Sequence, residues 1–208
     1  MTTSYLTVAG PGRAETEVKR SRFICRIERV DSEEAARAVV EEERKRYWDA
    51  RHHCSAFVLG PDGDVQRSSD DGEPSGTAGA PMLEVLRGRG LSDVVAVVTR
   101  YFGGVLLGAG GLVRAYTDAV RAGLDAAGSR ERRLLERYVV EVPHADAGKL
   151  ENALRAYGVA VLGVDYGAAA TLHLAVPAGE SDQLARRLAE LTGGELRPTS
   201  AGTEWVEV

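Results

Sequence analysis

Cysteine is scarce in this sequence, which contains only Cys25 and Cys54 among its 208 residues. Two cysteines can form at most one disulfide, and such bonds rarely persist in a reducing cytosol, so both are expected to be buried thiols. No apolar run approaches the roughly 18 residues that a membrane-spanning helix needs. The first ten residues carry neither a basic nor a long apolar stretch, so no secretory signal is predicted. These absences predict a soluble, cytoplasmic protein that does not contact membranes.

An excess of positive charge is also missing, because the formal net charge is -5. Residues 1–137 hold 21 basic and 21 acidic residues, whereas residues 138–208 hold five basic and ten acidic ones. A protein that grips phosphates without sequence preference usually carries a basic field. The overall charge therefore argues against strong non-specific nucleic-acid binding and leaves only local basic patches for that purpose.

The length of the chain favours two domains, each large enough to bury its own core. We expect them at residues 1–130 and 138–208, with the boundary in the arginine-rich segment 130–137. In the first domain, apolar and turn patterns predict both strands and helices. The expected elements are a strand over 21–30, a helix capped by Asp31, a hairpin of strands 54–59 and 65–68, a helix with Pro81 in its first turn, a buried central strand over 94–98, and a helix from 112 to about 127.

The second domain has a more regular pattern of alternating strands and helices. The expected order is a strand over 138–142, a helix over 146–157, strands over 159–166 and 169–176, a helix over 181–192 and a last strand over 203–208. This β-α-β-β-α-β order is that of a ferredoxin-like sandwich. The fold class predicted for the whole chain is therefore α+β.

The most informative stretch is residues 99–116, which reads as a strand, a glycine loop and a helix. Glycines allow a ligand to approach the backbone, helix N-terminal amides attract anions, and arginines form charge-assisted bonds with phosphate. The stretch matches neither a Walker A loop nor the dinucleotide fingerprint. The alternative is that the glycines only permit close packing of strand and helix. The residues expected to bind RNA or another phosphate are Arg100, Tyr101, Gly103, Gly104, Gly108, Gly110, Gly111 and Arg114.

A second polar segment, residues 70–77, groups carboxylates and hydroxyls that suit a hard cation such as magnesium. The alternative is a polar turn in which Ser75 or Thr77 caps the next helix. Ser75 lies outside a nucleophile elbow and has no nearby histidine in the sequence, so no catalytic residue is predicted. The residues of this accessory polar site are Asp70, Asp71, Glu73, Ser75, Thr77 and His53.

Two further clusters near residue 50 carry weaker signals. His52 and Cys54 would share one face of a strand, with Cys25 as a neighbour, but a fourth zinc ligand and paired Cys-x-x-Cys motifs are lacking, so no metal site is predicted. Tyr47 and Trp48 follow the basic run 44–46 and could stack RNA bases, although such a cluster is more often a helix end docked on the core.

Four segments together resemble the Impact/YigZ family: residues 19–23, 53–56, 70–81 and 99–116. The resemblance covers residues 17–127 as the Impact N-terminal domain, and residues 138–208 resemble the small C-terminal domain of bacterial members. It implies a first domain like the second domain of ribosomal protein S5 and a ferredoxin-like second domain.

Those folds occur in the translation machinery, so the leading hypothesis is a non-enzymatic, translation-linked regulator that binds RNA or the ribosome and needs no cofactor. One alternative is a magnesium-dependent enzyme acting on a phosphorylated small molecule. A second alternative is a regulator that binds a protein partner through the acidic C-terminal domain. Fold analogy does not choose among the three.

Overall fold

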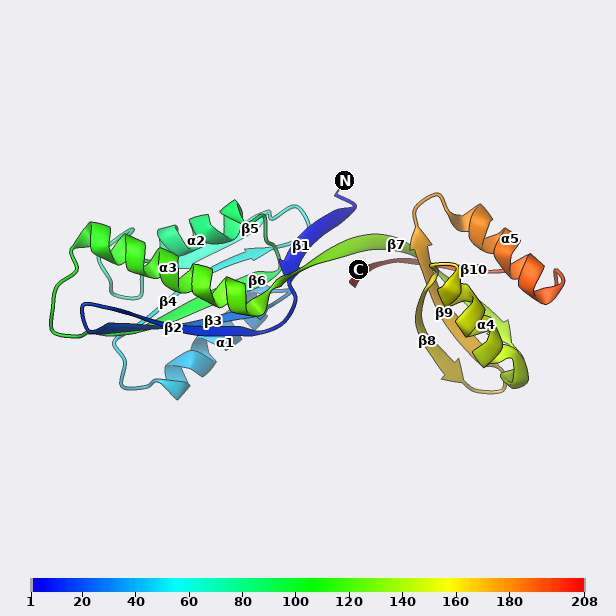
Figure 1. Cartoon of the computed structure of the whole chain (residues 1–208), viewed down its shortest axis with the longest axis horizontal. Coiled ribbons are helices and arrows are strands. Elements are labelled where there is room, and N and C mark those ends of the chain that lie inside the picture. Colours follow the sequence, from blue (N-terminus) through cyan, green and yellow to red (C-terminus); the bar gives the residue numbers. More distant parts are fainter. Residues whose placement is uncertain (1, 208) are drawn as a thin grey trace. The chain divides into compact units, whose positions relative to one another are not determined.

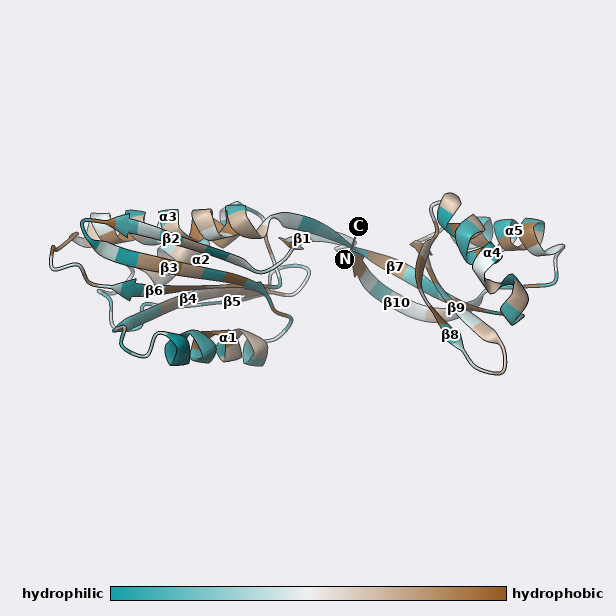
Figure 2. Cartoon of the chain, turned by 60° about the horizontal axis from the view of Figure 1, so that its bottom comes forward, coloured by the Kyte–Doolittle hydropathy of each residue, from teal (hydrophilic) through white to brown (hydrophobic). Residues whose placement is uncertain are grey.

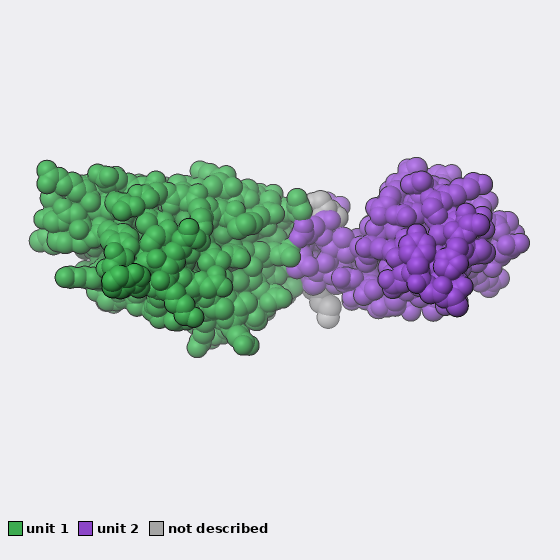
Figure 3. Space-filling model, turned by 90° about the horizontal axis from the view of Figure 1, so that it is seen from below, with its two compact units in different colours: residues 1–131 green, residues 132–208 purple. Residues whose placement is uncertain are grey.

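A computed structural model describes residues 2–207, in which five helices and ten strands form a two-domain α+β protein. The chain divides into two compact units, Met1–Glu131 and Arg132–Val208 (Figure 3). Each unit has its own hydrophobic core. Across the described residues, no helix combines the length and apolar character needed to cross a membrane.

The first unit is built on an antiparallel sheet with the strand order β2-β3-β6-β4-β5 (Figure 1). The strands are β2 (Gly12–Val18), β3 (Ser21–Arg29), β6 (Val94–Tyr101), β4 (His52–Leu59) and β5 (Val65–Ser69). The predicted hairpin and the predicted central strand are confirmed as β4-β5 and β6. A short strand, β1 (Ser4–Val8), forms a parallel bridge from Leu6 to Leu91.

Helices cover both faces of this sheet, with α1 (Glu33–Arg46) on one side and α2 (Gly79–Gly88) and α3 (Ala109–Ala127) on the other (Figure 2). Successive side chains of a strand point to opposite faces. In β6, Val94, Ala96 and Val98 therefore join the core beneath α2 and α3, whereas Val95 and Val97 join the core beneath α1. Burial on both faces explains why this strand reads as an uninterrupted apolar run.

The start of α1 differs from the prediction by one residue. Ser32, not Asp31, is the N-cap, and its hydroxyl accepts a hydrogen bond from the Ala35 amide at 3.3 Å. The backbone of Ser32 is extended, as an N-cap requires, and serine caps as well as aspartate does. The predicted cap was therefore wrong, although the helix itself is confirmed.

The second unit has the predicted β-α-β-β-α-β order and the antiparallel strand order β10-β7-β9-β8 of a ferredoxin-like sandwich. Its elements are β7 (Ser129–Val142), α4 (His144–Ala156), β8 (Ala160–Tyr166), β9 (Ala170–Pro177), α5 (Ser181–Thr192) and β10 (Thr199–Glu207). Residue 208 of the predicted last strand lies outside the described residues. Leu172 and Leu174 of β9 pack with α4 and α5 in a separate core. The arginine-rich segment 130–137 is part of the long strand β7.

Candidate functional site

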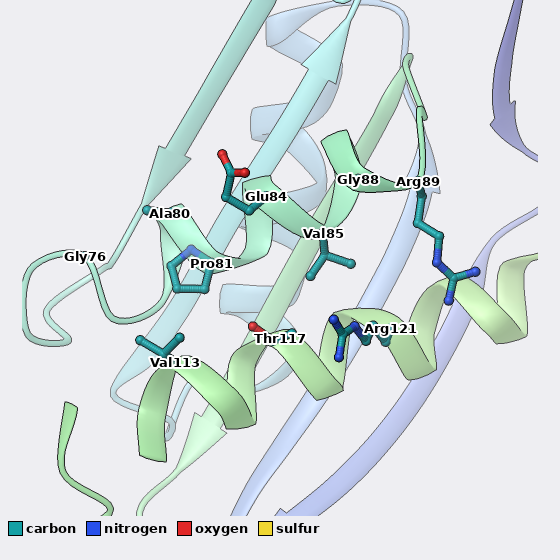
Figure 4. Close-up of a pocket in the computed structure, with 10 residues that line it drawn as sticks. All are labelled: Gly76, Ala80, Pro81, Glu84, Val85, Gly88, Arg89, Val113, Thr117 and Arg121. Atoms are coloured by element: carbon teal, nitrogen blue, oxygen red, sulfur yellow. The ribbon is translucent and has the colours of Figure 1, made fainter. Parts of the chain in front are cut away.

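Both predicted motifs lie where a strand leads into a helix of the first unit. Residues 70–78 connect β5 to α2, and residues 102–108, the glycine loop, connect β6 to α3. Figure 4 shows α2 and α3 side by side and running in the same direction. A groove of about 610 Å³ lies between them. Pro81 and Val113 line one end of this groove, and Arg89 and Arg121 line the other (Figure 4). The N-termini of the two helices, and the two motifs, therefore lie at the same end of the sheet.

Arg100 and Glu73 join the two motifs through a buried ion pair. The Arg100 Nη1 donates to Glu73 Oε1 at 2.7 Å, and the two side chains are only 7% and 3% exposed. The Tyr116 hydroxyl donates to the same Glu73 oxygen at 2.8 Å, and Arg100 Nη2 lies 3.4 Å from Ser21 Oγ. The Arg100 Nε has no hydrogen-bond partner among the described residues. Arg100 thus has an internal partner, and a contact with phosphate stays a prediction.

The position of Arg100 follows from strand alternation. It lies two residues after Val98, so it points to the same face of the sheet, toward α2 and α3. Its guanidinium carbon lies 5.5 Å from the ring centre of Phe23 and 5.6 Å from that of Phe102, close enough for cation-π attraction. The strand that leads into the glycine loop is therefore fixed by charge and by aromatic contacts.

Asp70 closes the N-terminus of α2. Its carboxylate accepts hydrogen bonds from the amides of Gly76 at 2.8 Å, Ala78 at 3.0 Å and Gly79 at 2.8 Å. Desolvation alone would raise the pKa of Asp70, but these three donors outweigh it and hold the pKa below its ordinary value. Neither Ser75 nor Thr77 is the cap, so that expectation was wrong. The Thr77 hydroxyl instead donates to the Pro74 carbonyl at 2.6 Å, and the Ser75 side chain is exposed.

Asp71 anchors the same segment to β4 and α1. It accepts from the His53 amide at 2.7 Å and from Arg44 at 2.8 Å. The His53 ring is buried, its Nε2 lies 3.2 Å from the Tyr47 carbonyl, and desolvation lowers its pKa. Asp70, Asp71 and Glu73 therefore each have separate protein partners. Over residues 2–207, no group of three or more histidine, cysteine or acidic side chains is arranged to hold a metal ion.

The two cysteines are buried, free thiols on either side of the central strand. Cys25 of β3 and Cys54 of β4 are both paired with Val98 of β6. Neighbouring strands lie about 4.8 Å apart, so the two Cα atoms are about 10 Å apart, too far for a disulfide. Burial raises the pKa of the Cys54 thiol to about 12, and its sulfur donates to the Asp70 carbonyl at 3.0 Å.

The N-terminus of α3, in contrast to that of α2, has no side-chain cap. The first amide bonded within the helix is that of Leu112, which donates to the Gly108 carbonyl at 3.0 Å. Within the described part of the chain, the amides of Ala109, Gly110 and Gly111 have no acceptor. These three amides point out of the helix end, where an anion is favoured.

The glycines of the loop serve different purposes. A Cβ atom on Gly103 would lie 2.1 Å from the backbone carbonyl carbon of Arg20, so only glycine fits there. Gly104 and Gly108 have positive φ angles of 82° and 73°. A Cβ atom on Gly110 would meet nothing within 4 Å, and its φ is not positive. Packing therefore explains Gly103 but not Gly110.

Exposed cations lie on the glycine loop side of this unit. Arg114 of α3 and Lys19 and Arg20 of the β2-β3 turn are exposed and form no ion pair with any described residue. Because Gly103 lies against Arg20, the turn and the loop are in contact. The sequence singled out Lys19 and Arg20 only as part of a family motif, and the role of Tyr116 was missed. The period of α3, in which Leu112, Ala115 and Tyr116 share the buried face, is the signal that could have placed Tyr116.

Comparisons with known proteins match both units. The Impact N-terminal domain model matches residues 19–124, and a domain of unknown function (DUF1949) matches residues 140–195. The chain is 43% identical over 192 residues to the IMPACT family member YvyE of Bacillus subtilis, covering 92% of this chain and 88% of that protein. It is 40% identical to the IMPACT family member YigZ of Escherichia coli, over 93% of this chain and 96% of that protein. A crystal structure described only as that of a hypothetical protein is similar with a TM-score of 0.65 and 38% identity, covering 97% of this chain and 98% of that one.

Proposed function

This chain belongs to the IMPACT family, and we propose that its first unit binds the phosphate backbone of RNA, free or in the ribosome, as a translation-linked regulator. The observation that carries the proposal is the difference between two neighbouring helix ends. Asp70 accepts hydrogen bonds from the amides of Ala78 and Gly79 at the start of α2, whereas the amides of Ala109, Gly110 and Gly111 of α3 have no acceptor among the described residues. An open helix N-terminus with glycines in its first turn is suited to an anion such as phosphate.

Three exposed cations strengthen the attraction for a polyanion. Arg114 lies in the second turn of α3, and helical side chains lean toward the N-terminus of their helix, which favours a position of its guanidinium near the glycine loop. The backbone of Arg20, which follows Lys19 in the β2-β3 turn, lies against Gly103 of the loop. The net charge of -5 means that binding depends on this local patch. We therefore expect binding that weakens steeply with salt.

The buried Arg100–Glu73 pair has a supporting role in this proposal. It fixes the end of β6, from which the glycine loop begins, against the segment that leads into α2. Packing does not explain why residue 110 is glycine. The absence of a side chain there gives the ligand backbone space at the first turn of α3. We therefore propose that the ligand contacts Gly108, Gly110, Gly111 and Arg114, and that Arg100 positions the loop.

The test is a comparison of two arginines on the same helix. Arg114→Ala should weaken binding to ribosomes or to single-stranded RNA roughly 10- to 150-fold, because a charge-assisted contact contributes roughly 1.5–3 kcal/mol. Arg121→Ala is the control, since Arg121 is also exposed on α3 but lies farther from the helix N-terminus. Its Nη1 forms an ion pair with Asp118 Oδ1 at 3.7 Å. Co-sedimentation with ribosomes and anisotropy with labelled RNA measure both.

The salt dependence of the binding affinity provides a second test with the same variants. The slope of log affinity against log salt should flatten by roughly 0.7 for each phosphate that the variant no longer neutralises. If Arg114→Ala and Arg121→Ala bind equally well and with equal slopes, the proposed site is wrong. If the second unit alone retains the binding of the full chain, a partner of the acidic unit replaces the RNA proposal.

A further inference from the structure

Trp48 is unusually exposed for a tryptophan. It follows Tyr47, the C-cap of α1, and 81% of its surface is accessible, whereas tryptophan is normally one of the more buried side chains. The sequence left two expectations for this pair, an RNA-stacking surface or a helix end docked on the core. Tyr47 is half-buried, and its ring meets that of Tyr101 edge-on with the ring centres 6.4 Å apart. Trp48, in contrast, is not docked on the core. The fold therefore leaves one large aromatic face of Trp48 in water.

Trp48 is part of a larger group of aromatic side chains, the aromatic strip, which comprises Tyr47, Trp48, Tyr101 and Phe102. The Tyr101 hydroxyl donates to Asp49, the residue after Trp48, at 2.6 Å, which ties the segment of Trp48 to the end of β6. Tyr101 is followed by Phe102, which is 50% exposed, and then by Gly103 of the glycine loop. The aromatic strip is thus continuous, along the chain and through these interactions, with the proposed phosphate site.

The charge beside the aromatic strip is positive. Lys45, Arg46 and Arg51 are exposed, and none forms an ion pair with a described residue. The Arg46 guanidinium carbon lies 5.7 Å from the ring centre of Tyr47. The nearby carboxylate of Asp49 already accepts a hydrogen bond from Tyr101. Exposed aromatic faces flanked by unpaired cations are complementary to a flexible polyanion with flat rings.

We infer that the aromatic strip stacks the bases of single-stranded RNA whose phosphates lie at the glycine loop. This inference rests on the proposed function and narrows it to one class of RNA. In a duplex the bases are stacked on each other and closed to side chains, whereas unpaired bases splay out onto aromatic rings. Trp48 and Phe102 have the exposed rings, and the contacts of Tyr101 with Tyr47 and Asp49 connect their two segments.

The fluorescence of Trp48 reports stacking directly. The chain has two tryptophans, so Trp205→Phe leaves Trp48 as the sole tryptophan emitter. The probes are an oligouridylate of roughly twelve nucleotides, an RNA duplex of equal length and inorganic polyphosphate, which carries phosphates but no base. We expect the oligouridylate to quench Trp48, and the duplex and polyphosphate to leave its emission nearly unchanged.

Affinity measurements use Trp48→Ala with Tyr166→Ala as the matched control, because Tyr166 is an exposed aromatic residue of the second unit. Loss of one stacked base should weaken oligouridylate binding roughly tenfold and leave polyphosphate binding unchanged. Trp48→Phe should restore much of the loss. Arg114→Ala should weaken both ligands.

The outcomes separate this inference from the proposed function. If oligouridylate binding depends on Arg114 but Trp48→Ala equals Tyr166→Ala and the fluorescence is unchanged, stacking is wrong and the phosphate site stands. If neither RNA nor polyphosphate binds, both proposals fail. Quenching of Trp48 by polyglutamate but not by oligouridylate would assign the strip to an acidic protein segment and overturn the inference.

Discussion

Arg100 shows how a residue expected at a binding surface can be part of the framework behind it. Its guanidinium is shared between Glu73 and Ser21, and Glu73 also accepts from Tyr116. The ion pair is almost completely removed from water, where an unpaired charge is very costly. Arg100 therefore connects the stability of the first unit to the shape of the glycine loop.

We predict that Arg100→Ala destabilises the first unit by about 3–5 kcal/mol, because it leaves the Glu73 carboxylate buried without its partner. Urea denaturation followed by circular dichroism measures this change. Arg114→Ala, at an exposed position, should change stability by no more than about 0.5 kcal/mol. An Arg100→Ala protein as stable as the wild type would show that the pair contributes nothing to the fold.

At the scale of elements, the two helix N-termini at one end of the sheet differ in capping, because α2 has a capping side chain and α3 has none. Asp70 directly follows β5 and caps α2, whereas the N-cap of α3 is Gly108, which has no side chain to accept a hydrogen bond. A carboxylate at a helix N-terminus is favoured by the helix dipole as well as by its hydrogen bonds. At α2 this favourable interaction is made by a carboxylate of the chain itself. At α3 it is open to an anion from outside the chain.

We predict that Asp70→Ala lowers stability at neutral pH by about 1 kcal/mol, the usual loss when a capping side chain is removed. The pKa of Asp70 is lowered in the folded state, so its contribution is present above the unfolded pKa of about 4 and is lost as the pH falls through the folded value. The stability difference between wild type and Asp70→Ala should therefore shrink as the pH is lowered below the unfolded pKa. Denaturation at several pH values measures it.

Asp31→Ala is the matched control for this cap, because Asp31 is an exposed aspartate next to the real cap of α1. It should change stability by less than about 0.5 kcal/mol. A difference between wild type and Asp70→Ala that stays constant down to low pH would contradict the role assigned to the ionised carboxylate.

Local patterns predicted most elements correctly, because the period of apolar residues reflects which faces are buried. The central strand, the hairpin after residue 54 and the order of the second unit all follow from such patterns. Strand β2 (Gly12–Val18) was missed because it lies at the sheet edge, where only Gly12 is fully buried and charged residues alternate with small ones. A pattern rule that looks for buried apolar residues gives no signal there.

The candidate site was predicted as two motifs, but their connection was not. The sequence gives no distance between Glu73 and Arg100, which are 27 residues apart and meet through tertiary packing. Strand alternation from Val98 could have placed Arg100 on a buried face, although it could not have named its partner. Asp70 caps α2 from nine residues away, beyond the reach of the usual capping patterns, which place the cap next to the helix.

At the scale of the whole molecule, the described buried residues of each unit form their own hydrophobic clusters. One group of buried side chains, including Met82, lies beneath α2 and α3 of the first unit, and another, including Leu172, lies beneath α4 and α5 of the second. Separate family models match residues 19–124 and 140–195. Residues that share one core tend to unfold together, so two separate cores favour two unfolding units.

We predict that the chain unfolds in two transitions, each assigned to one unit by a single core substitution. Met82 and Leu172 are both fully buried, and truncation of such side chains to alanine costs about 2–5 kcal/mol. Met82→Ala should lower the melting temperature of one transition and Leu172→Ala that of the other, as measured by calorimetry. The transition lowered by Met82→Ala should also be the one raised by RNA, since a ligand stabilises only the unit that it binds. If either substitution lowers both transitions equally, the two units unfold as one.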